Sequence, residues 1–568
     1  MIEKASKIVV IGGVACGPKA AARAHRLDPK AEITIIDKGS YISYASCGLP
    51  YYIAGAVPDL EGLMTNSSGT LRDCDYFTYE KGITVLARSE VCQIDRQKKE
   101  ITIKNLDTSE FTTLPYDKLV LATGAEPIVP PIKGITLEGV YLLRRPEDAF
   151  KLRTAIEDGQ ADRICTIGAG RIALELCDAF EAQAVETTII EIANQTLPTM
   201  LDKELADYVA GTLRKNKVKL LLSEKVMRLE GDADGRVVKV ITDKREIETD
   251  AVLVGVGVKP NVDLAREIDL EIGSTGAVKV NEYLQTSDPD IYAGGDCVEC
   301  SNIISGENIY FPLGSVANRH GRVIGTNIAG GRDRFFGVLG TSAVKTLGIN
   351  IATTGINETT AARLGYQAVI CLHPAGDKSH FFPGGKYVVL KLVVDANTRR
   401  ILGAQAVGNG DVVKPIDTIA GIMNFAATID DLANLDLAYA PPFSSSINNV
   451  VHCANIVRNK LDLLIDAITP IMLKQKLLNG KNIAILDIRS EAELQLGEIK
   501  HDDVHVIPVA ELRSRINELP KDKELVVGCQ VGVRAYDIMR NVLIKAGFTR
   551  LSMLDGGWHV WIGCGYNE

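Results

Sequence analysis

The sequence predicts an α/β protein in which strands and helices alternate along most of the chain. Residues 7–37 read as a strand, a glycine turn, an alanine-rich helix and a second strand, and the same order returns at residues 163–191. Residues 471–568 again alternate short apolar strands with helical patterns. This repeating order is typical of sheets that carry helices on their faces.

The bulk composition indicates a globular protein of several domains. The chain has 568 residues, against a usual domain size of about 150. Its net charge of −9 and the lack of a basic tract argue against a nucleic-acid partner. No run approaches the roughly 18 apolar residues that span a bilayer, and the N-terminus enters a strand directly, so we expect a cytoplasmic protein with no membrane partner. Among the twelve cysteines only Cys297 and Cys300, in CVEC, come close to a zinc-binding spacing, and they follow a flavoenzyme-like motif, so we expect no metal site.

The first strand–turn–helix unit has the layout of a dinucleotide-binding site. Its turn carries Gly12, Gly13 and Gly17, with Val14 where the usual fingerprint has its second glycine, and its second strand ends at Asp37. Such a turn lets a pyrophosphate approach backbone amides at a helix N-terminus, while the acidic residue accepts a ribose hydroxyl. The unit therefore predicts dinucleotide binding.

The second unit repeats this layout and adds a cofactor preference. Gly168, Gly170 and Ala173 belong to its turn, and Glu191 ends the following strand. An acidic side chain at this place suits the free 2′-hydroxyl of NADH and repels the 2′-phosphate of NADPH. We therefore expect NADH rather than NADPH.

Two further stretches complete a specific set of motifs. YDKLVLATGAEP at 116–127 and TSDPDIYAGGDCVE at 286–299 each run a strand into a glycine turn. Across residues 7–455 the four motifs together resemble the flavoprotein reductases of the pyridine nucleotide–disulfide oxidoreductase superfamily. The resemblance implies FAD at the first unit, NAD(P)H at the second, Asp296 against the ribityl–phosphate region of the flavin, and an obligate homodimer. It also implies FAD contacts at Lys38, Val91, Thr123, Gly124 and Ala317, and an NAD(P)H contact at Gly257.

The resemblance divides the chain into domains, two of them Rossmann-like. The expected ranges are 1–125 and 250–335 for a split FAD-binding domain, 126–249 for the NAD(P)H-binding domain, 336–455 for an α+β dimerisation domain, 456–470 for a helical linker and 471–568 for a C-terminal α/β domain. Within the expected dimerisation domain, apolar and polar residues alternate at period two, as in half-buried strands.

A single cysteine stands in SYASCGLPYY, where Gly48 and Pro50 argue against a place deep in a helix. Relatives with an internal disulfide carry two closely spaced cysteines, but the nearest neighbours of Cys47 are the distant Cys16 and Cys74. A lone redox cysteine forms a mixed disulfide with an external thiol or becomes a sulfenic acid. The context resembles the single-cysteine branch: coenzyme A-disulfide reductases, NADH oxidases and peroxidases, and NADH-dependent persulfide reductases.

One position helps to divide that branch. Oxidases and peroxidases carry a histidine in the first glycine turn, where this chain has Ala15. Without an acid–base group there, peroxide chemistry at Cys47 lacks its proton donor, which favours a thiol or persulfide substrate. An NADH oxidase or peroxidase working through a Cys47 sulfenic acid stays open as an alternative, as does a redox sensor or sulfur carrier with incidental turnover.

The helix after the first turn presents a cationic face. Lys19, Arg23 and Arg26 are spaced i, i+4 and i+7, so they share one side. A solvated stripe is one interpretation. In coenzyme A-disulfide reductases, however, the matching positions contact the coenzyme A tail, as do those matching Ser43, Ser46 and Lys81. Such a face suits a substrate with several phosphates.

Three positions depart from the coenzyme A-binding pattern. Phe381 and Phe382 replace a tyrosine pair, and Ile447 stands where relatives have a lysine that contacts the substrate. Tyr439 is retained, and the resemblance implies that it reaches the site of the neighbouring subunit as a proton donor. These positions thus lack the tyrosine hydroxyls and one cation of the coenzyme A-binding pattern.

The C-terminal domain carries a second chemically distinctive cysteine. In CQVGVRAY a strand ends at Cys529, a turn contains Gly532, and Arg534 opens a helix. Backbone amides and a guanidinium at this place would stabilise a thiolate or persulfide anion. With LDIRSEAE and LDGGW as flanking signatures, the domain resembles a rhodanese, although a buried structural cysteine is the alternative.

Together the resemblances predict an FAD-dependent, NADH-driven reductase of sulfur–sulfur bonds. Cys47 would attack coenzyme A persulfide, polysulfide or coenzyme A disulfide, with Cys529 supplying sulfane sulfur.

Overall fold

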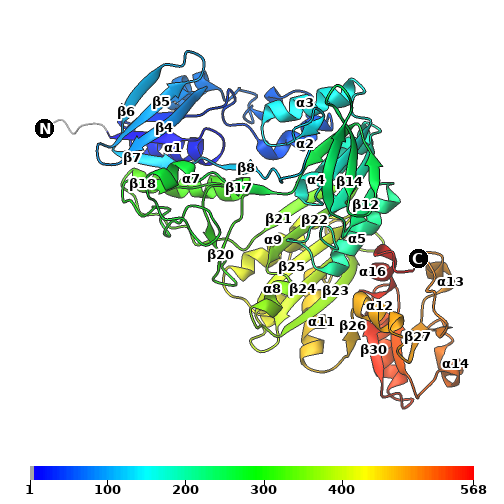
Figure 1. Cartoon of the computed structure of the whole chain (residues 1–568). Helices are drawn as coiled ribbons and strands as arrows, with labels where there is room; N and C mark the ends of the chain where they lie inside the picture. Colours follow the sequence, from blue (N-terminus) through cyan, green and yellow to red (C-terminus); the bar gives the residue numbers. More distant parts are fainter. Residues whose placement is uncertain (1–5, 568) are drawn as a thin grey trace. The chain divides into compact units, whose positions relative to one another are not determined.

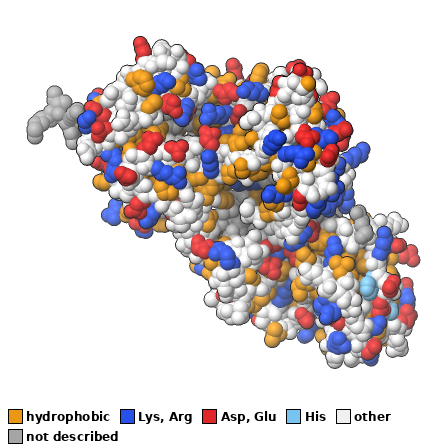
Figure 2. Space-filling model, viewed as in Figure 1, with side chains coloured by type: hydrophobic (Ala, Val, Ile, Leu, Met, Phe, Trp, Pro, Cys, Tyr) orange, Lys and Arg blue, Asp and Glu red, His pale blue; other side chains and the backbone are white. Residues whose placement is uncertain are grey.

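The computed structural model describes residues 6–567, which fall into two compact units (Figure 1). Unit 1 comprises Met1–Gly168, Asp178–Glu186 and Val226–Val338, and unit 2 comprises Ala169–Cys177, Thr187–Lys225 and Leu339–Glu568. Parallel sheets flanked by helices occur in both, which confirms the predicted α/β class. No helix among the described residues is long and apolar enough to cross a membrane. Acidic and basic side chains are interspersed over the face shown in Figure 2.

Unit 1 is built on a five-stranded parallel sheet. In spatial order its strands are β18 (Ile291–Ala293), β7 (Lys118–Leu121), β1 (Lys7–Ile11), β2 (Glu32–Ile36) and β3 (Thr84–Leu86). Ile8 and Val10 of β1 face the helices α1 (Cys16–Leu27) and α7 (Gly314–Ile328), whereas Val9 and Ile11 belong to the core on the other face. That alternation follows from the period of two in a strand. The second core is completed by β4 (Ser89–Asp95), β5 (Glu100–Asn105) and β6 (Phe111–Pro115), an antiparallel sheet, and by α6 (Asp263–Glu267).

Glycines allow α1 and α7 to pack with their backbones in close approach. A Cβ at Gly321 would lie 2.5 Å from the carbonyl oxygen of Cys16, and one at Gly325 would lie 2.4 Å from that of Ala20. Neither distance is compatible with a side chain, so these two positions on α7 require glycine. The packing fixes the helix that follows the first glycine turn.

Unit 1 also contains a second group of parallel strands, together with antiparallel strands and a further helix. They include β8 (Ala125–Pro127), β9 (Val140–Tyr141), α3 (Pro146–Glu157), β10 (Arg163–Ile167), β13 (Val226–Gly231), β14 (Val237–Thr242), β15 (Glu246–Glu248), β16 (Ala251–Val254) and β17 (Val258–Pro260). Strand β16 pairs in parallel with β10 on one side and β9 on the other. In unit 2, β11 (Glu186–Glu191) runs parallel to β12 (Lys219–Leu222) and is accompanied by α5 (Lys203–Lys215).

A five-stranded antiparallel sheet forms the middle of unit 2. Its order is β21 (Ser342–Thr346), β22 (Ile349–Gly355), β25 (Ile401–Gly408), β24 (Tyr387–Asp395) and β23 (Ala368–Gly376), with α8 (Glu358–Arg363), α9 (Val413–Met423), α10 (Ile429–Ala433) and α11 (Asn449–Leu461) around it. The period-two pattern predicted half-buried strands, but every residue of β25 is buried, as is β24 from Val388 onward. Polar Lys391 and Gln405 therefore lie inside the protein rather than on a solvated face.

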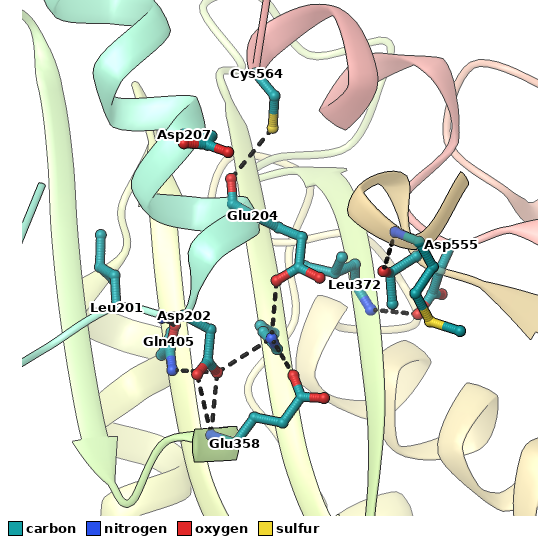
Figure 3. A network of polar contacts seen from close by, with 12 residues as sticks. Leu201, Asp202, Glu204, Asp207, Glu358, Leu372, Gln405, Asp555 and Cys564 are labelled. Carbon is teal, nitrogen blue, oxygen red and sulfur yellow. Dashed lines mark hydrogen bonds and ion pairs between the residues drawn. The ribbon is translucent and has the colours of Figure 1, made fainter. Parts of the chain in front are cut away.

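Lys391 is buried within a group of acidic side chains, of which Asp202, Glu204 and Glu358 are labelled in Figure 3. Its Nζ lies 3.1 Å from Asp202 Oδ2, 3.2 Å from Glu204 Oε2 and 2.9 Å from Glu358 Oε2. Gln405 donates to Asp202 Oδ2 at 2.8 Å. Burial of Lys391 acts to lower its pKa, but the three carboxylates outweigh that effect and raise it, so Lys391 stays charged.

The C-terminal sheet of unit 2 is parallel throughout. Its order is β26 (Ala467–Ile468), β30 (Leu551–Leu554), β29 (Glu524–Gly528), β27 (Ile483–Asp487) and β28 (Val504–Val506), accompanied by α12 (Pro470–Leu478), α13 (Glu491–Leu494), α14 (Leu512–Arg515), α15 (Val533–Ile538) and α16 (Gly557–Gly563). The stretch expected to be a helical linker is divided in the structure. Residues 456–461 belong to α11, whereas residues 467–468 already pair with β30.

Candidate functional site

A cavity of about 650 Å³ opens in unit 1 beside the first glycine turn. Its wall contains ten of the eleven positions for which FAD contacts were predicted: Gly12, Gly13, Val14, Asp37, Lys38, Val91, Thr123, Gly124, Asp296 and Ala317. Gly17 is the exception, because it packs α1 onto the turn, where a Cβ would lie 1.9 Å from the carbonyl oxygen of Gly12. The structure thus brings together predicted residues that are up to 305 positions apart.

Asp37 links the end of β2 to the glycine turn. Its carboxylate accepts the Gly13 N–H at 2.6 Å and the Gly39 N–H at 2.7 Å. Burial raises the pKa of Asp37, although both amide bonds act to lower it. Each carboxylate oxygen has a further lone pair, so a ribose hydroxyl finds an acceptor here. A glycine turn, the start of a twelve-residue helix and an acidic strand end fit the adenosine and pyrophosphate of FAD.

Two residues at this cavity were not identified from the sequence. Arg144 lines the wall with its Nη2 atom 3.2 Å from Asp296 Oδ2, and its Nε donates to the carbonyl oxygen of Ala125 at 3.0 Å. The paired arginines of LLRRPED, directly after a strand, were the available signal. His320, buried on α7, accepts the Gly295 N–H on Nδ1 at 3.1 Å, and burial lowers its pKa to about 3. A neutral imidazole therefore supports the turn that carries Asp296.

Cys47 lies at the edge of this cavity. It belongs to a single 3₁₀ turn, Ser46–Gly48, which precedes the short helix α2 (Leu49–Ile53). The residue is exposed, and its Sγ lies 3.8 Å from the position a Cβ would take on Gly314, a residue of the cavity wall. All twelve cysteines fall within the described residues and are free thiols. Cys47 thus has no disulfide partner in its own chain.

The predicted cationic face lies on α1, where Lys19 and Arg26 are exposed. Arg23 is half-buried, and its Nε donates to Thr326 Oγ1 at 3.1 Å. The Lys81 turn lies against the same helix, because a Cβ on the next residue, Gly82, would be 2.7 Å from Nε2 of His25 on α1.

The two predicted serines lie close to the glycine turn. Ser43 is buried and donates its N–H to the carbonyl oxygen of Gly13 at 2.7 Å. Ser46 lines the cavity. The Cys47 thiol, the cavity and the basic side chains of α1 therefore occupy one region of unit 1.

The residues predicted to bind NAD(P)H are divided between the two compact units. In unit 2, buried Glu191 accepts the N–H groups of Ala169 and Ala193, each at 2.8 Å. Helix α4 (Arg171–Ala182) begins directly after Gly170, and its residues up to Cys177, Ala173 among them, belong to this unit. In unit 1, Gly168 has φ +102°, and a Cβ there would lie 2.6 Å from the Gly255 carbonyl oxygen. Gly257, at φ +116°, follows β16. A carboxylate that orders the turn while keeping free lone pairs fits a ribose hydroxyl of a pyridine nucleotide.

The four residues of the predicted coenzyme A-binding pattern that follow residue 380 lie on unit 2. Tyr439, Phe381 and Ile447 are exposed, whereas Phe382 is half-buried. Two hydrogen bonds of Ser379 bring their segments together: its N–H donates to the Pro441 carbonyl at 3.1 Å and its hydroxyl to the Ser444 carbonyl at 3.0 Å. Exposed apolar and aromatic side chains such as these fit a surface that contacts another subunit.

Cys529 is buried at the end of β29. The Gly532 N–H donates to its Sγ at 3.1 Å, and Gly532 has φ +98°. Arg534 forms an ion pair with Glu493. Burial acts to lower the pKa of the Arg534 guanidinium, but the bond to Glu493 and the neighbouring Cys529 raise it overall. An amide donor and a permanent cation next to one sulfur suit a persulfide anion.

Comparison with known proteins agrees with this geometry. The family described as "Pyridine nucleotide-disulphide oxidoreductase" matches residues 6–321, its dimerisation domain matches 341–451, and "Rhodanese-like domain" matches 469–564. The "NAD(P)H coenzyme A polysulfide/persulfide reductase" of Pyrococcus horikoshii is 36% identical over 80% of this chain and 98% of its own length. The "Coenzyme A disulfide reductase" of Staphylococcus haemolyticus is 31% identical over 77% of this chain and 96% of its own.

Two solved structures extend the similarity to nearly the whole chain. The NAD-dependent persulfide reductase of A. fulgidus is 42% identical, with a TM-score of 0.93 over 98% of this chain and 100% of its own. Reduced CoADR-RHD of Bacillus anthracis is 34% identical, with a TM-score of 0.90 over 99% and 98%. These matches confirm the resemblance drawn from the motifs. The chain belongs to the pyridine nucleotide-disulphide oxidoreductase family and ends in a rhodanese-like domain.

Proposed function

We propose that the protein is an FAD-dependent, NADH-driven reductase of sulfur–sulfur bonds, acting on coenzyme A persulfide, polysulfide or coenzyme A disulfide. The observation that carries the proposal is the exposed Cys47 thiol at the edge of the dinucleotide cavity, without a histidine in the adjacent glycine turn. The names of the relatives from Pyrococcus horikoshii and Staphylococcus haemolyticus support the same substrate class.

In this proposal Cys47 performs the chemistry on sulfur. Its thiolate attacks a persulfide R–S–SH at the substituted sulfur, so that a Cys47–S–S–R bond forms and hydrosulfide leaves. FAD, when bound, would accept a hydride from NADH and supply two electrons to the sulfur site. Uptake of two electrons and one proton by the mixed disulfide returns the Cys47 thiolate and releases R–SH. Tyr439, from the neighbouring subunit of a homodimer, donates a proton to the departing sulfur.

The remaining predicted residues take binding roles. Lys19, Arg23, Arg26 and Lys81 attract the phosphates of a coenzyme A carrier, and Ser43 and Ser46, in the turn beside the thiol, contact the same carrier. Glu191 selects NADH. Cys529, stabilised by the Gly532 amide and Arg534, accepts sulfane sulfur and passes it through a persulfide carrier to Cys47.

Anaerobic NADH oxidation tests the proposal with wild type, Cys47→Ser and Cys529→Ser, each given coenzyme A persulfide, polysulfide and coenzyme A disulfide in turn. We expect persulfide or polysulfide to turn over fastest and Cys47→Ser to abolish turnover. If coenzyme A disulfide is fastest and Cys529→Ser is unimpaired, the two cysteines serve separate reactions. Turnover with oxygen but with none of the sulfur acceptors refutes the proposal in favour of an oxidase.

A further inference from the structure

A buried ion pair joins the C-terminal domain to the antiparallel sheet of the same unit. The Nζ atom of Lys460, on α11, lies 2.7 Å from Oδ2 of Asp555 and also donates to the Ile370 carbonyl at 2.7 Å. The Leu372 N–H, on β23, donates to the same Asp555 oxygen at 3.2 Å (Figure 3). The side chain of Asp555 is 1% exposed and that of Lys460 is 12% exposed. A carboxylate is thus held by two neighbouring elements of the sheet domain.

The residues after Asp555 hold the backbone of the Cys529 loop. Gly556 and Gly557 both have positive φ, and a Cβ on Gly557 would lie 2.5 Å from the Cys529 carbonyl oxygen. The Trp558 N–H donates to that same carbonyl at 3.0 Å. The His559 N–H donates to the Gln530 carbonyl at 3.0 Å. Any displacement of the turn at 555–559 therefore displaces the loop that carries the sulfur.

The position of the ionised Asp555 side chain depends on the positive charge of Lys460. Burial raises the pKa of Asp555, while Lys460 acts to lower it. Two further titratable groups interact with this pair, Cys453 on α11 and Glu204 on α5, and Glu204 raises the pKa of Asp555 further. Without Lys460, an ionised Asp555 would be a buried charge with no cation beside it, which proteins avoid by protonation or by rearrangement.

We propose that Lys460 is a positioning residue for sulfur transfer at Cys529: it fixes Asp555, and the turn that Asp555 begins fixes the sulfur loop. The proposal rests on the role of Cys529 as a sulfur acceptor. It means that the rhodanese-like domain obtains its active loop geometry from its contact with the antiparallel sheet domain, not from its own fold alone.

The test follows sulfur loading of Cys529 in the full-length protein. The Cys529 thiolate attacks the outer sulfur of thiosulfate, forming Cys529–S–S⁻ and releasing sulfite, and peptide mass spectrometry measures the rate. Lys460→Gln should slow loading by about tenfold or more, because small misplacements of a reacting group cost this much. The control Lys523→Gln removes a 2.7 Å ion pair with Asp503 inside the same domain and should leave the rate unchanged.

Two features separate positioning from general damage. The deficit of Lys460→Gln relative to wild type should shrink as pH falls, because protonation of Asp555 removes the uncompensated charge. The double variant Lys460→Gln/Asp555→Asn should load within about threefold of wild type, because neither partner is then charged. Reduction of bound FAD by NADH should be unchanged in all variants.

Equal loading rates for wild type and Lys460→Gln at every pH overturn the positioning role, as does a double variant no faster than the single. If Lys460→Gln does not fold, Asp555→Asn and the double variant carry the comparison, with the double expected to be faster. A wild type that forms no persulfide on Cys529 overturns both this role and the proposed sulfur supply.

Discussion

Replacing Lys391 by methionine preserves the bulk of the side chain but removes the charge that Asp202, Glu204 and Glu358 share. Glu358 is 44% exposed and reaches water, and Asp202 keeps its bonds to Gln405 and to a backbone amide. The loss of the lysine charge therefore affects chiefly the buried carboxylate of Glu204. Breaking a buried ion pair typically costs about 3–5 kcal/mol. Uptake of a proton by a buried carboxylate limits the cost, because neutralising an ordinary glutamate requires about 3.7 kcal/mol at pH 7, at about 1.36 kcal/mol per pH unit.

The sign of the pH dependence follows from the same reasoning. In Lys391→Met the folded protein keeps a proton on a buried carboxylate that the unfolded chain releases, so the penalty is smallest in acid and grows as pH rises. Urea unfolding at pH 5, 6 and 7, followed by circular dichroism, should show a deficit growing by about 1.4 kcal/mol per pH unit. Lys391→Met/Glu204→Gln should recover most of it. A single variant within about 1 kcal/mol of wild type, with no pH slope, refutes the reasoning.

Three further predictions concern the binding sites. Glu191→Ala should raise the ratio of NADPH to NADH catalytic efficiency by about tenfold or more, because a repelling carboxylate is removed; an unchanged ratio contradicts the assignment. His320→Leu should speed FAD release, measured by the rise of flavin fluorescence, whereas His320→Asn keeps an acceptor for the Gly295 N–H and should resemble wild type. Lys19→Gln/Arg26→Gln should raise KM several-fold for coenzyme A persulfide but not for inorganic polysulfide, and added salt should shrink that difference; equal effects on both substrates argue against phosphate recognition.

Local signals in the sequence located the glycine turns and the two distinctive cysteines. Gly12 needs a positive φ and close backbone contact, which a glycine between a strand and a helix reveals by itself. Cys47 and Cys529 stand in short segments whose turn residues limit their conformation. The α/β class followed from the order of such segments.

Residues whose role depends on distant partners escaped prediction. Arg144 meets Asp296 across 152 positions, and His320 meets Gly295 across a helix packing that no local pattern specifies. Lys391 stands in a stretch whose period-two alternation gives it no special role, yet carboxylates 187 and 33 positions away hold it in the core. The period of a sequence pattern shows which side chains share one face of a strand, but not which elements pack against that face.

Helix α16 has a consequence for how the chain is made. The Cys564 thiol donates to the carbonyl of Glu204, on α5, across 360 positions, and a Cβ on Gly211 would lie 2.3 Å from the Gly563 carbonyl oxygen. At about 5–20 residues per second, a ribosome needs roughly 20–70 seconds to add the segment between them. Until α16 has been made, the side of α5 that packs against it stays exposed. Nascent chains should therefore depend on chaperones until α16 has been made, and a stop codon before α16 should destabilise the packing of α5, which was made long before.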